Sequence, residues 1–320
     1  MTTSYEADEA KRLSLDGHRF IETSASSIVT GGYKLDKCLW AGTSPICPIT
    51  IGVSPHFGRI LFLDDQVQSA QSDEAIYHEF LVQPAMARTA DIGNKSVMIV
   101  GGGEGATTRE VLRWDRDSVE SVDWVDIDGG LVELCKEHLK YADESVYADK
   151  RSTFEASDIR TFWDRKLKEG KKYDVIILDL CDLEIEKAED TSSTTNDVDY
   201  PLYGKKFFSV IKALMRDDRS VLVSHAGTVT PGGSPSVRRA GLGYMKKVAK
   251  EAGIGQKEGV CYHALIPSFQ SHWSWFISGG EGDDKKENVW PENLACMSDE
   301  TFEYAKIWPT YWLDKKFGKF

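Results

Sequence analysis

The sequence lacks cysteine pairs spaced as C-x-x-C, and it lacks long apolar runs. Its six cysteines are scattered along 320 residues, which indicates reduced thiols and gives no zinc-binding pattern. No apolar stretch approaches the length of a membrane-spanning helix, and the N-terminal residues lack the basic and then apolar order of a signal peptide. We therefore expect a cytoplasmic protein that has no metal site and no membrane contact.

Positive charge is also scarce. The chain carries 39 Lys and Arg against 51 Asp and Glu, a net charge of −12. This balance argues against DNA or RNA as a partner and is compatible with a cationic small molecule. The hydrophobic content of 41% is ordinary for a soluble globular protein. A chain of this length predicts one large domain or two unequal ones.

The most informative stretch is a glycine-rich turn between two expected strands, residues 96–100 and 121–127. The turn contains Gly101, Gly103 and Gly105 in a G-x-G-x-G pattern, and a helical pattern follows it. Asp126 comes roughly 20 residues after the last glycine, which is the layout of a nucleoside-binding βαβ unit. An acid at this position can accept hydrogen bonds from both ribose hydroxyls. A turn with only a structural role remains the alternative.

The residue inside this turn narrows the choice of nucleoside. Glu104 would repel a pyrophosphate and would suit a cationic ligand. S-adenosylmethionine and its decarboxylated form combine a ribose and an adenine with a positive sulfonium. We therefore favour this class of ligand over NAD and over a Rossmann dehydrogenase.

The rest of the chain alternates in the manner of an α/β protein. Before the turn we expect β segments at residues 33–40, 48–53 and 59–63, and a helix over residues 71–88. After it we expect strands at 152–156, 173–178 and 220–224, helices at 130–139, 162–167, 203–215 and 236–252, and a closing antiparallel pair at 260–266 and 274–278. The sequence thus predicts an N-terminal antiparallel β domain over residues 1–70 and a Rossmann-like nucleoside-binding domain over residues 71–320.

Polar residues in two separate segments are candidates for catalysis. Asp179 follows a fully apolar strand, at the edge where open α/β sheets bind ligands, and is a candidate general base. A helix cap or a loop acid is the alternative. Tyr77 and His78 form a polar cluster on the expected helix, and a satisfied interface pair is their alternative. The polar stretch 184–200 is a candidate lid.

Several motifs, taken together, are familiar. SAQSDEAIYHE, GGGEG, YDVIILDLCD and YHALIPSFQSHWSWFIS make the sequence similar to the spermidine synthase family of aminopropyltransferases, and IPSF followed by W-x-W resembles its thermospermine branch. The resemblance implies a Rossmann-like, methyltransferase-type sheet with a small N-terminal antiparallel β domain. It also implies a homodimer that transfers an aminopropyl group from decarboxylated S-adenosylmethionine to a polyamine and releases methylthioadenosine.

The resemblance also implies residue roles. Asp179 would be the catalytic acid-base residue. The nucleoside donor would be bound by Gln68, His78, the turn residues Gly101, Gly103, Glu104 and Gly105, Asp126 with Ile127 at the ribose, and Asp158 with Ile159 at the adenine. The acceptor amine would be bound by Tyr77, Asp182, Tyr203, His225 and Phe269. Tyr203 would lie in the loop region that gates the active site in this family.

The departures from the family pattern gather on the acceptor side. The proline that usually follows the second aspartate is missing after Asp182, and His225 stands where glutamine is usual. An alternative is therefore a methyltransferase or related alkyltransferase that uses intact S-adenosylmethionine on a small-molecule nucleophile. Glu104 favours the decarboxylated donor, because it would repel a carboxylate and attract a bare ammonium. A catalytically inactive polyamine-binding protein is a third possibility, against which the retention of both Asp179 and Asp182 argues.

Overall fold

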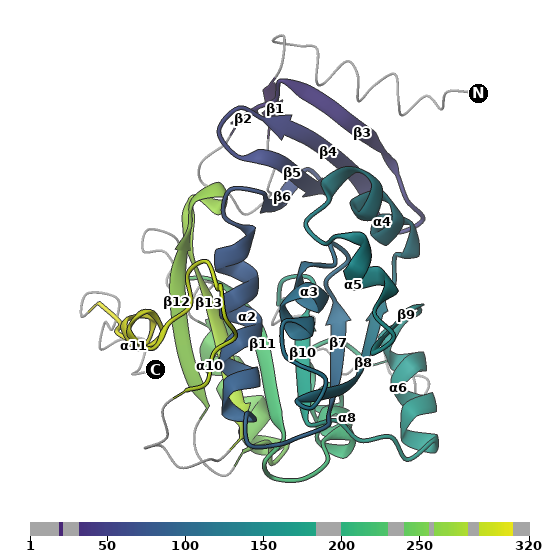
Figure 1. Ribbon diagram of the computed structural model, residues 1–320, viewed down its shortest axis with the longest axis vertical. Coiled ribbons are helices and arrows are strands. Elements are labelled where there is room, and N and C mark those ends of the chain that lie inside the picture. The colour runs from purple at the N-terminus through teal and green to yellow at the C-terminus, as the bar shows by residue number, and fades with distance from the viewer. Residues whose placement is uncertain are drawn as a thin grey trace.

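A computed structural model describes residues 19–21, 32–183, 200–229, 240–255, 259–280 and 288–309. The described residues form three sheets, of two, four and seven strands. Figure 1 shows the four-stranded sheet above the larger one, with helices on both sides of the latter. Within these residues no helix has both the length and the apolar character needed to cross a bilayer.

The N-terminal strands form two antiparallel sheets. The first pairs β1 (Arg19–Ile21) with β2 (Gly32–Lys34), and the second is a meander of β3 (Lys37–Thr43), β4 (Pro48–Ser54), β5 (Gly58–Leu63) and β6 (Gln66–Ala70). The predicted hairpin is confirmed, because β4 and β5 pair from Ile49 with Leu63 to Ser54 with Gly58. The prediction of one strand over residues 33–40 is wrong. The chain changes sheets between Lys34 and Lys37, and a register shift follows between Cys38 and Trp40.

The large sheet has the order β12-β13-β11-β10-β7-β8-β9. The strands β7 to β11 pair in parallel with one another, whereas β13 pairs antiparallel with both β11 and β12. Their bounds are β7 Lys95–Gly101, β8 Val119–Asp126, β9 Ser152–Ala156, β10 Val175–Asp179, β11 Val221–Thr228, β12 Val260–Ile266 and β13 Ser271–Gly279. The expected α/β class is confirmed, and β11 extends four residues beyond the predicted end at Ser224, so that His225 lies within the strand.

Alternate residues of the buried strands face two separate cores. In β7, Met98 and Val100 belong to one apolar cluster, whereas Val97 and Ile99 belong to the other. This follows from the side-chain period of two in a strand whose faces are both covered. The described helices on the first face are α6 (Ile159–Lys168), α8 (Lys205–Leu214) and α10 (Ala240–Glu251); those on the second are α2 (Glu74–Arg88), α3 (Ala106–Leu112) and α11 (Asp299–Ala305).

Some elements differ from the predicted ones or were not predicted at all. The expected helix over residues 130–139 is α4 (Gly129–Leu134) continued by a π-helix (Cys135–Leu139), and the short α5 (Glu144–Ala148) follows it. Strand β6 and helix α11 also fall outside the predicted segments. The candidate lid falls almost entirely in residues 184–199, which lie outside the described residues.

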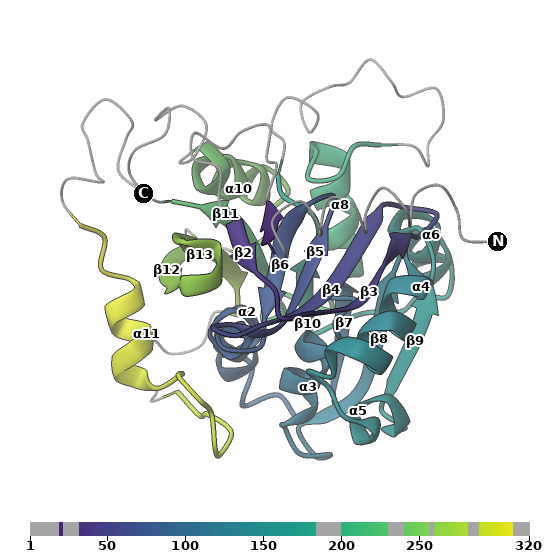
Figure 2. The ribbon, with the colours of Figure 1, turned by 90° about the horizontal axis from the view of Figure 1, so that it is seen from above.

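The four-stranded sheet packs on the segment that follows β8. Ile49, Ile51 and Leu61 share an apolar cluster with Leu131 and Leu139. Figures 1 and 2 show this sheet lying across the carboxyl ends of β7 and β10. It therefore lies next to the glycine-rich turn. The division of the chain into domains at residue 70 stays a prediction.

The C-terminal segment is attached to helix α2 through one buried carboxylate. Glu79 is fully buried and accepts hydrogen bonds from the backbone N–H groups of Ala295 (2.6 Å), Cys296 (2.9 Å) and Met297 (2.9 Å). The Cys296 thiol also donates to it at 3.0 Å. Since Glu79 follows Tyr77 and His78 directly, this contact also holds the part of α2 that carries the candidate site residues.

Candidate active site

The site lies where the strand order reverses, between β7 and β10. Asp179, the last residue of β10, pairs with Gly101, the last residue of β7, and its carbonyl accepts the N–H of Gly102 at 3.1 Å. Gly101 has a φ of +83°, and a Cβ there would lie 2.0 Å from the Asp179 carbonyl oxygen. Glycine is thus required for this contact. Open α/β sheets bind ligands at this position.

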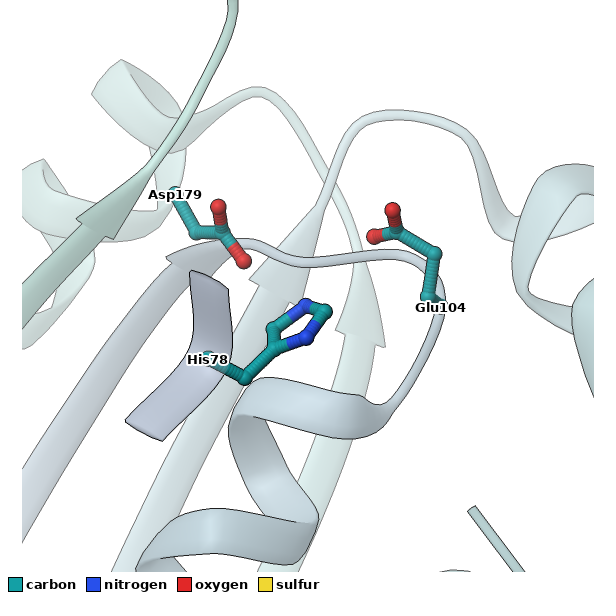
Figure 3. Close-up of side chains that lie close together, drawn as sticks. All are labelled: His78, Glu104 and Asp179. Carbon is teal, nitrogen blue, oxygen red and sulfur yellow. The ribbon is translucent and has the colours of Figure 1, made fainter. Parts of the chain in front are cut away.

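Three ionisable side chains from different elements converge here. His78 comes from α2, Glu104 from the turn after β7 and Asp179 from the end of β10, and their nitrogen and oxygen atoms lie within 4.8 Å of one another. Figure 3 shows the imidazole of His78 pointing between the two carboxylates. The predicted catalytic residue and two predicted donor-binding residues therefore form one cluster.

Both oxygens of Asp179 accept hydrogen bonds from hydroxyl groups. The Tyr77 hydroxyl donates to Oδ1 at 2.9 Å, and the Thr107 hydroxyl donates to Oδ2 at 2.5 Å. Burial and the nearby Asp179 carboxylate raise the pKa of Tyr77 well above its ordinary value, so this phenol stays protonated and remains a donor. The carboxylate is therefore fixed in orientation.

His78 is held as a cation by Glu74. Its Nδ1 lies 2.7 Å from the Glu74 carbonyl oxygen and 3.0 Å from Glu74 Oε2, and both are acceptors, so Nδ1 carries a proton. Burial opposes the charge on His78, but Glu74 outweighs it and raises the pKa of His78 to about 9. Burial likewise opposes ionisation of Glu74, but its hydrogen bonds with His78 and with Arg109, at 2.8 and 2.9 Å, lower its pKa to about 2.

Glu104 is the residue of this cluster whose protonation state is the most sensitive to its surroundings near neutral pH. Burial and the Asp179 carboxylate raise its pKa to about 7, although the His78 cation acts in the opposite direction. A ligand with positive charge beside Glu104 would stabilise its ionised form. One imidazole and two carboxylates could also ligate a metal, but a metal ligand must be a neutral imidazole. The raised pKa of His78 favours the protonated imidazole, which competes with metal binding, and the two carboxylates would attract an organic cation.

Asp126 occupies the end of β8, next to the same turn. Burial raises its pKa to about 6, and its Oδ1 accepts the N–H of Asp128 at 2.8 Å. A Cβ on Gly103 would lie 3.3 Å from Asp126 Oδ2, so the turn passes close to this carboxylate. The neighbouring Ile127 has 54% of its surface exposed. A hydrogen-bond acceptor and an exposed apolar side chain thus lie together at the edge of the sheet.

The remaining predicted donor residues lie farther along the sheet or in the small sheet. Asp158 caps α6 and bonds to the Arg160 guanidinium at 2.6 Å, which lowers the pKa of Asp158, while the adjacent Ile159 is buried. Gln68 lies in β6, where its amide nitrogen is 3.4 Å from the Gln66 carbonyl oxygen. Gly105 has a φ of +80° and begins α3, and a Cβ there would lie 2.7 Å from the Tyr147 hydroxyl.

Aromatic rings line the other side of Asp179. Tyr77 has its ring centroid 6.3 Å from that of His225, 6.2 Å from that of Phe269 and 5.8 Å from that of Trp275. His225 also stacks on Trp273 at 5.9 Å. The structure thus brings together three of the five residues predicted for the acceptor side.

His225 and the other two predicted acceptor residues surround the loop that follows β10. The Nε2 of His225 donates to the Leu180 carbonyl at 2.6 Å, and its Nδ1 has no hydrogen-bond partner within the described ranges. Asp182 is mostly exposed, and its carboxylate lies 3.9 Å from that Nδ1. Tyr203 is buried, with its hydroxyl 3.0 Å from the Cys181 carbonyl oxygen.

Sequence reasoning missed Glu74, Arg109 and Thr107. Glu74 lies one helical turn before His78, so the i, i+4 spacing of an acid and a histidine was an available signal. Arg109 and Thr107 follow the glycine-rich turn, and nothing in their spacing indicates that one binds Glu74 and the other Asp179. Their contacts depend on how α2 and β10 pack beside α3.

Comparison with known proteins agrees with this geometry. The chain matches the family described as spermine/spermidine synthase domain over residues 74–287. It is 32% identical to polyamine aminopropyltransferase 2 of Pseudomonas aeruginosa over 77% of this chain and 63% of that protein. It is 40% identical to the polyamine aminopropyltransferase of Pyrobaculum aerophilum over 56% of each, and 35% identical to that of Saccharolobus solfataricus over 79% of this chain and 75% of that protein. The chain thus spans 63% and 56% of the lengths of the first two of these relatives.

Two solved structures share the fold. The crystal structure of spermidine synthase from Thermotoga maritima gives a TM-score of 0.73 with 20% identity, covering 94% of this chain and 95% of that one. A spermidine synthase in complex with the transition-state analogue AdoDATO gives a TM-score of 0.74 at the same identity and the same coverage. The family match extends over two thirds of the sequence and includes β7, β10 and the three residues of the cluster. The chain therefore belongs to the spermine/spermidine synthase domain family.

Proposed function

We propose that the protein is an aminopropyltransferase, which moves the aminopropyl group of decarboxylated S-adenosylmethionine to a small-molecule amine and releases methylthioadenosine. The observation that carries this proposal is the cluster of His78, Glu104 and Asp179 at the carboxyl edge of β7 and β10. The names of the curated relatives and the family match support it.

The donor would bind along the carboxyl ends of β7, β8 and β9. Asp126 would accept hydrogen bonds from the ribose hydroxyls, and the exposed Ile127 would lie against the nucleoside beside it. Asp158 and Ile159 would meet the edge of the adenine, and Gln68 would close the site from β6. Glu104 would attract the ammonium of the aminopropyl group, and the two positive charges of the donor would favour its ionised form.

The transfer is a displacement at carbon. The lone pair of the acceptor nitrogen forms a bond to the methylene of the aminopropyl group that is attached to sulfur, and this carbon–sulfur bond breaks with its electron pair going to sulfur. The sulfonium becomes a neutral thioether, and the nitrogen gives its surplus proton to the Asp179 carboxylate. Asp179 thus orients the nucleophile and accepts its proton, while Tyr77 and Thr107 hold the carboxylate.

The acceptor would approach from the side lined by aromatic rings. Asp182 provides a carboxylate at the exposed end of this side, where it would attract a second ammonium of a polyamine. His225, Phe269 and Tyr77 would lie along the aliphatic chain of the acceptor, and Tyr203 would support the loop that carries Asp182. A polyamine of the thermospermine pathway and a homodimeric assembly remain predictions from the family resemblance.

The test is calorimetric binding of decarboxylated and intact S-adenosylmethionine to the wild-type protein and to Glu104→Gln. We expect wild type to prefer the decarboxylated form, because Glu104 attracts its ammonium and repels a carboxylate. Glu104→Gln should lose most of that preference. A preference of wild type for the intact molecule would replace the proposal with a methyltransferase or related alkyltransferase.

A further inference from the structure

The catalytic carboxylate of the proposed reaction is held by two hydroxyl groups, one on each oxygen. Tyr77 bonds to Oδ1 of Asp179 from α2, on the side lined by aromatic rings. Thr107 bonds to Oδ2 from the first turn of α3, on the opposite side of the carboxylate. Within the described residues, Asp179 is the hydrogen-bond partner of the Thr107 hydroxyl, and the side chain of Thr107 is fully buried.

The glycine-rich turn makes this contact possible. A Cβ on Gly102 would lie 3.0 Å from Asp179 Oδ2 and 3.3 Å from the Thr107 hydroxyl oxygen. Gly102 also has a φ of +72°, which disfavours other residues. The turn therefore keeps any side chain out of the space beside the bond between α3 and the end of β10.

A threonine hydroxyl suits a carboxylate that gains a proton. While Asp179 is ionised, Thr107 donates its hydroxyl proton to Oδ2. When Asp179 becomes protonated, the same hydroxyl can rotate and accept the new O–H, because a hydroxyl is both a donor and an acceptor. The carboxylate torsion of aspartate is soft, so without this contact the group could turn away from the acceptor nitrogen.

We propose that Thr107 is a positioning residue for the transfer reaction, which holds the Asp179 carboxylate in the orientation that receives the proton of the acceptor amine. This role rests on the proposed function. It predicts an effect on the rate of transfer and little effect on the binding of the donor, because Thr107 lies at the carboxylate and the donor nucleoside lies along Asp126.

The chain provides a matched set of variants. Thr107→Val keeps the shape and removes the hydroxyl, and Thr107→Ser restores the hydroxyl. Thr108→Val is the control, since Thr108 is the next residue of α3, is equally buried, and has a hydroxyl without a hydrogen-bond partner in the described part of the chain. Steady-state kinetics with decarboxylated S-adenosylmethionine and a polyamine would be measured for all four proteins, together with calorimetric donor binding.

We expect Thr107→Val to lower kcat by at least about tenfold and to leave donor affinity within about twofold of wild type. Thr107→Ser should recover most of the lost rate, and Thr108→Val should keep the wild-type rate. Wild-type kcat in Thr107→Val, failure of the serine variant to recover the rate, or an equal loss in Thr108→Val would each overturn the role of Thr107. If the wild-type protein itself transfers no aminopropyl group, the proposed function fails, and the role of Thr107 fails with it.

Discussion

The Nδ1 of His78 lies 3.0 Å from a carboxylate oxygen of Glu74, one turn earlier on the same helix. Arg109 closes the other side of that carboxylate with two hydrogen bonds. The three side chains thus form a partly buried row of alternating charge that ends next to Glu104 and Asp179. A positive imidazole at the end of the row reduces the repulsion between the two catalytic-site carboxylates before any substrate is bound.

The first prediction concerns the dependence of stability on pH. The pKa of His78 is raised from 6.5 to about 9, so its contribution to the free energy of unfolding is complete below pH 6.5 and is lost as pH rises through about 9. The pKa of Glu74 is lowered from 4.5 to about 2, so its contribution is complete above pH 4.5 and is lost as pH falls through about 2. Both contributions are complete between pH 4.5 and 6.5.

Urea unfolding of wild type and His78→Gln at about pH 6 and about pH 9.5 tests this linkage. Wild type should lose up to about 3 kcal/mol more stability than the variant over this interval. Equal losses in the two proteins would show that His78 is not a cation in the folded state.

The second prediction concerns Asp179. Replacement by Asn preserves the size of the side chain but removes the base, so we expect Asp179→Asn to abolish turnover and to leave nucleoside binding nearly intact. Asp117→Asn, on an exposed loop, is the control for a change of charge alone. Turnover assays and donor calorimetry would be compared, and substantial residual turnover would remove Asp179 from the catalytic role.

The third prediction concerns Asp126. Its carboxylate would lose two charge-assisted hydrogen bonds to the ribose, so Asp126→Ala should weaken donor binding by more than about tenfold. Calorimetry with decarboxylated S-adenosylmethionine measures the change. Asp123→Ala, which alters an acid of the same strand whose partners are Tyr173 and Lys166, is the control. Unchanged affinity in Asp126→Ala would mean that the ribose lies elsewhere.

The fourth prediction concerns Glu79. An amide at this buried position would point an N–H₂ group at backbone N–H donors, so Glu79→Gln should lower the free energy of unfolding by about 2 to 4 kcal/mol. Urea unfolding measures this loss. Glu300→Gln, on the exposed side of the C-terminal region, should change stability by less than about 0.5 kcal/mol. If Glu79→Gln lowered the free energy of unfolding by less than about 0.5 kcal/mol as well, the C-terminal segment would be held by other contacts.

The central part of the site could be predicted because its residues belong to regular, local patterns. The glycine-rich turn, the strands around it and the aspartate at the end of β10 each have a signal in the sequence, and parallel strands place their carboxyl ends at one edge. Asp179 and Gly101 are therefore adjacent although 78 residues separate them. The contribution of His78 from α2 follows only from the family resemblance, because no periodicity tells which helix packs beside a given strand.

The contacts that hold the site in place could not be predicted. Thr107 meets Asp179 through a side-chain hydrogen bond between two elements, and the break between β2 and β3 depends on a change of sheets. Helix α11 has a serine cap, Ser298, and acids in its first turn, which is a usual start signal for a helix, but its packing against the rest of the chain is not encoded by that signal. Long-range packing decides such contacts, and single-residue preferences carry little information about it.

The attachment of the C-terminal segment has a consequence for how this protein can vary. Glu79 recognises backbone N–H groups at Ala295, Cys296 and Met297, so this contact depends on side-chain identity only through the thiol of Cys296, whereas Met297 is itself buried in the apolar cluster shared with α2. A changed side chain at Ala295 or Cys296 would therefore leave the backbone hydrogen bonds to Glu79 possible, apart from proline, which has no N–H to offer. A single carboxylate on α2 thus fixes the path of the C-terminal segment over that helix through the backbone of the segment.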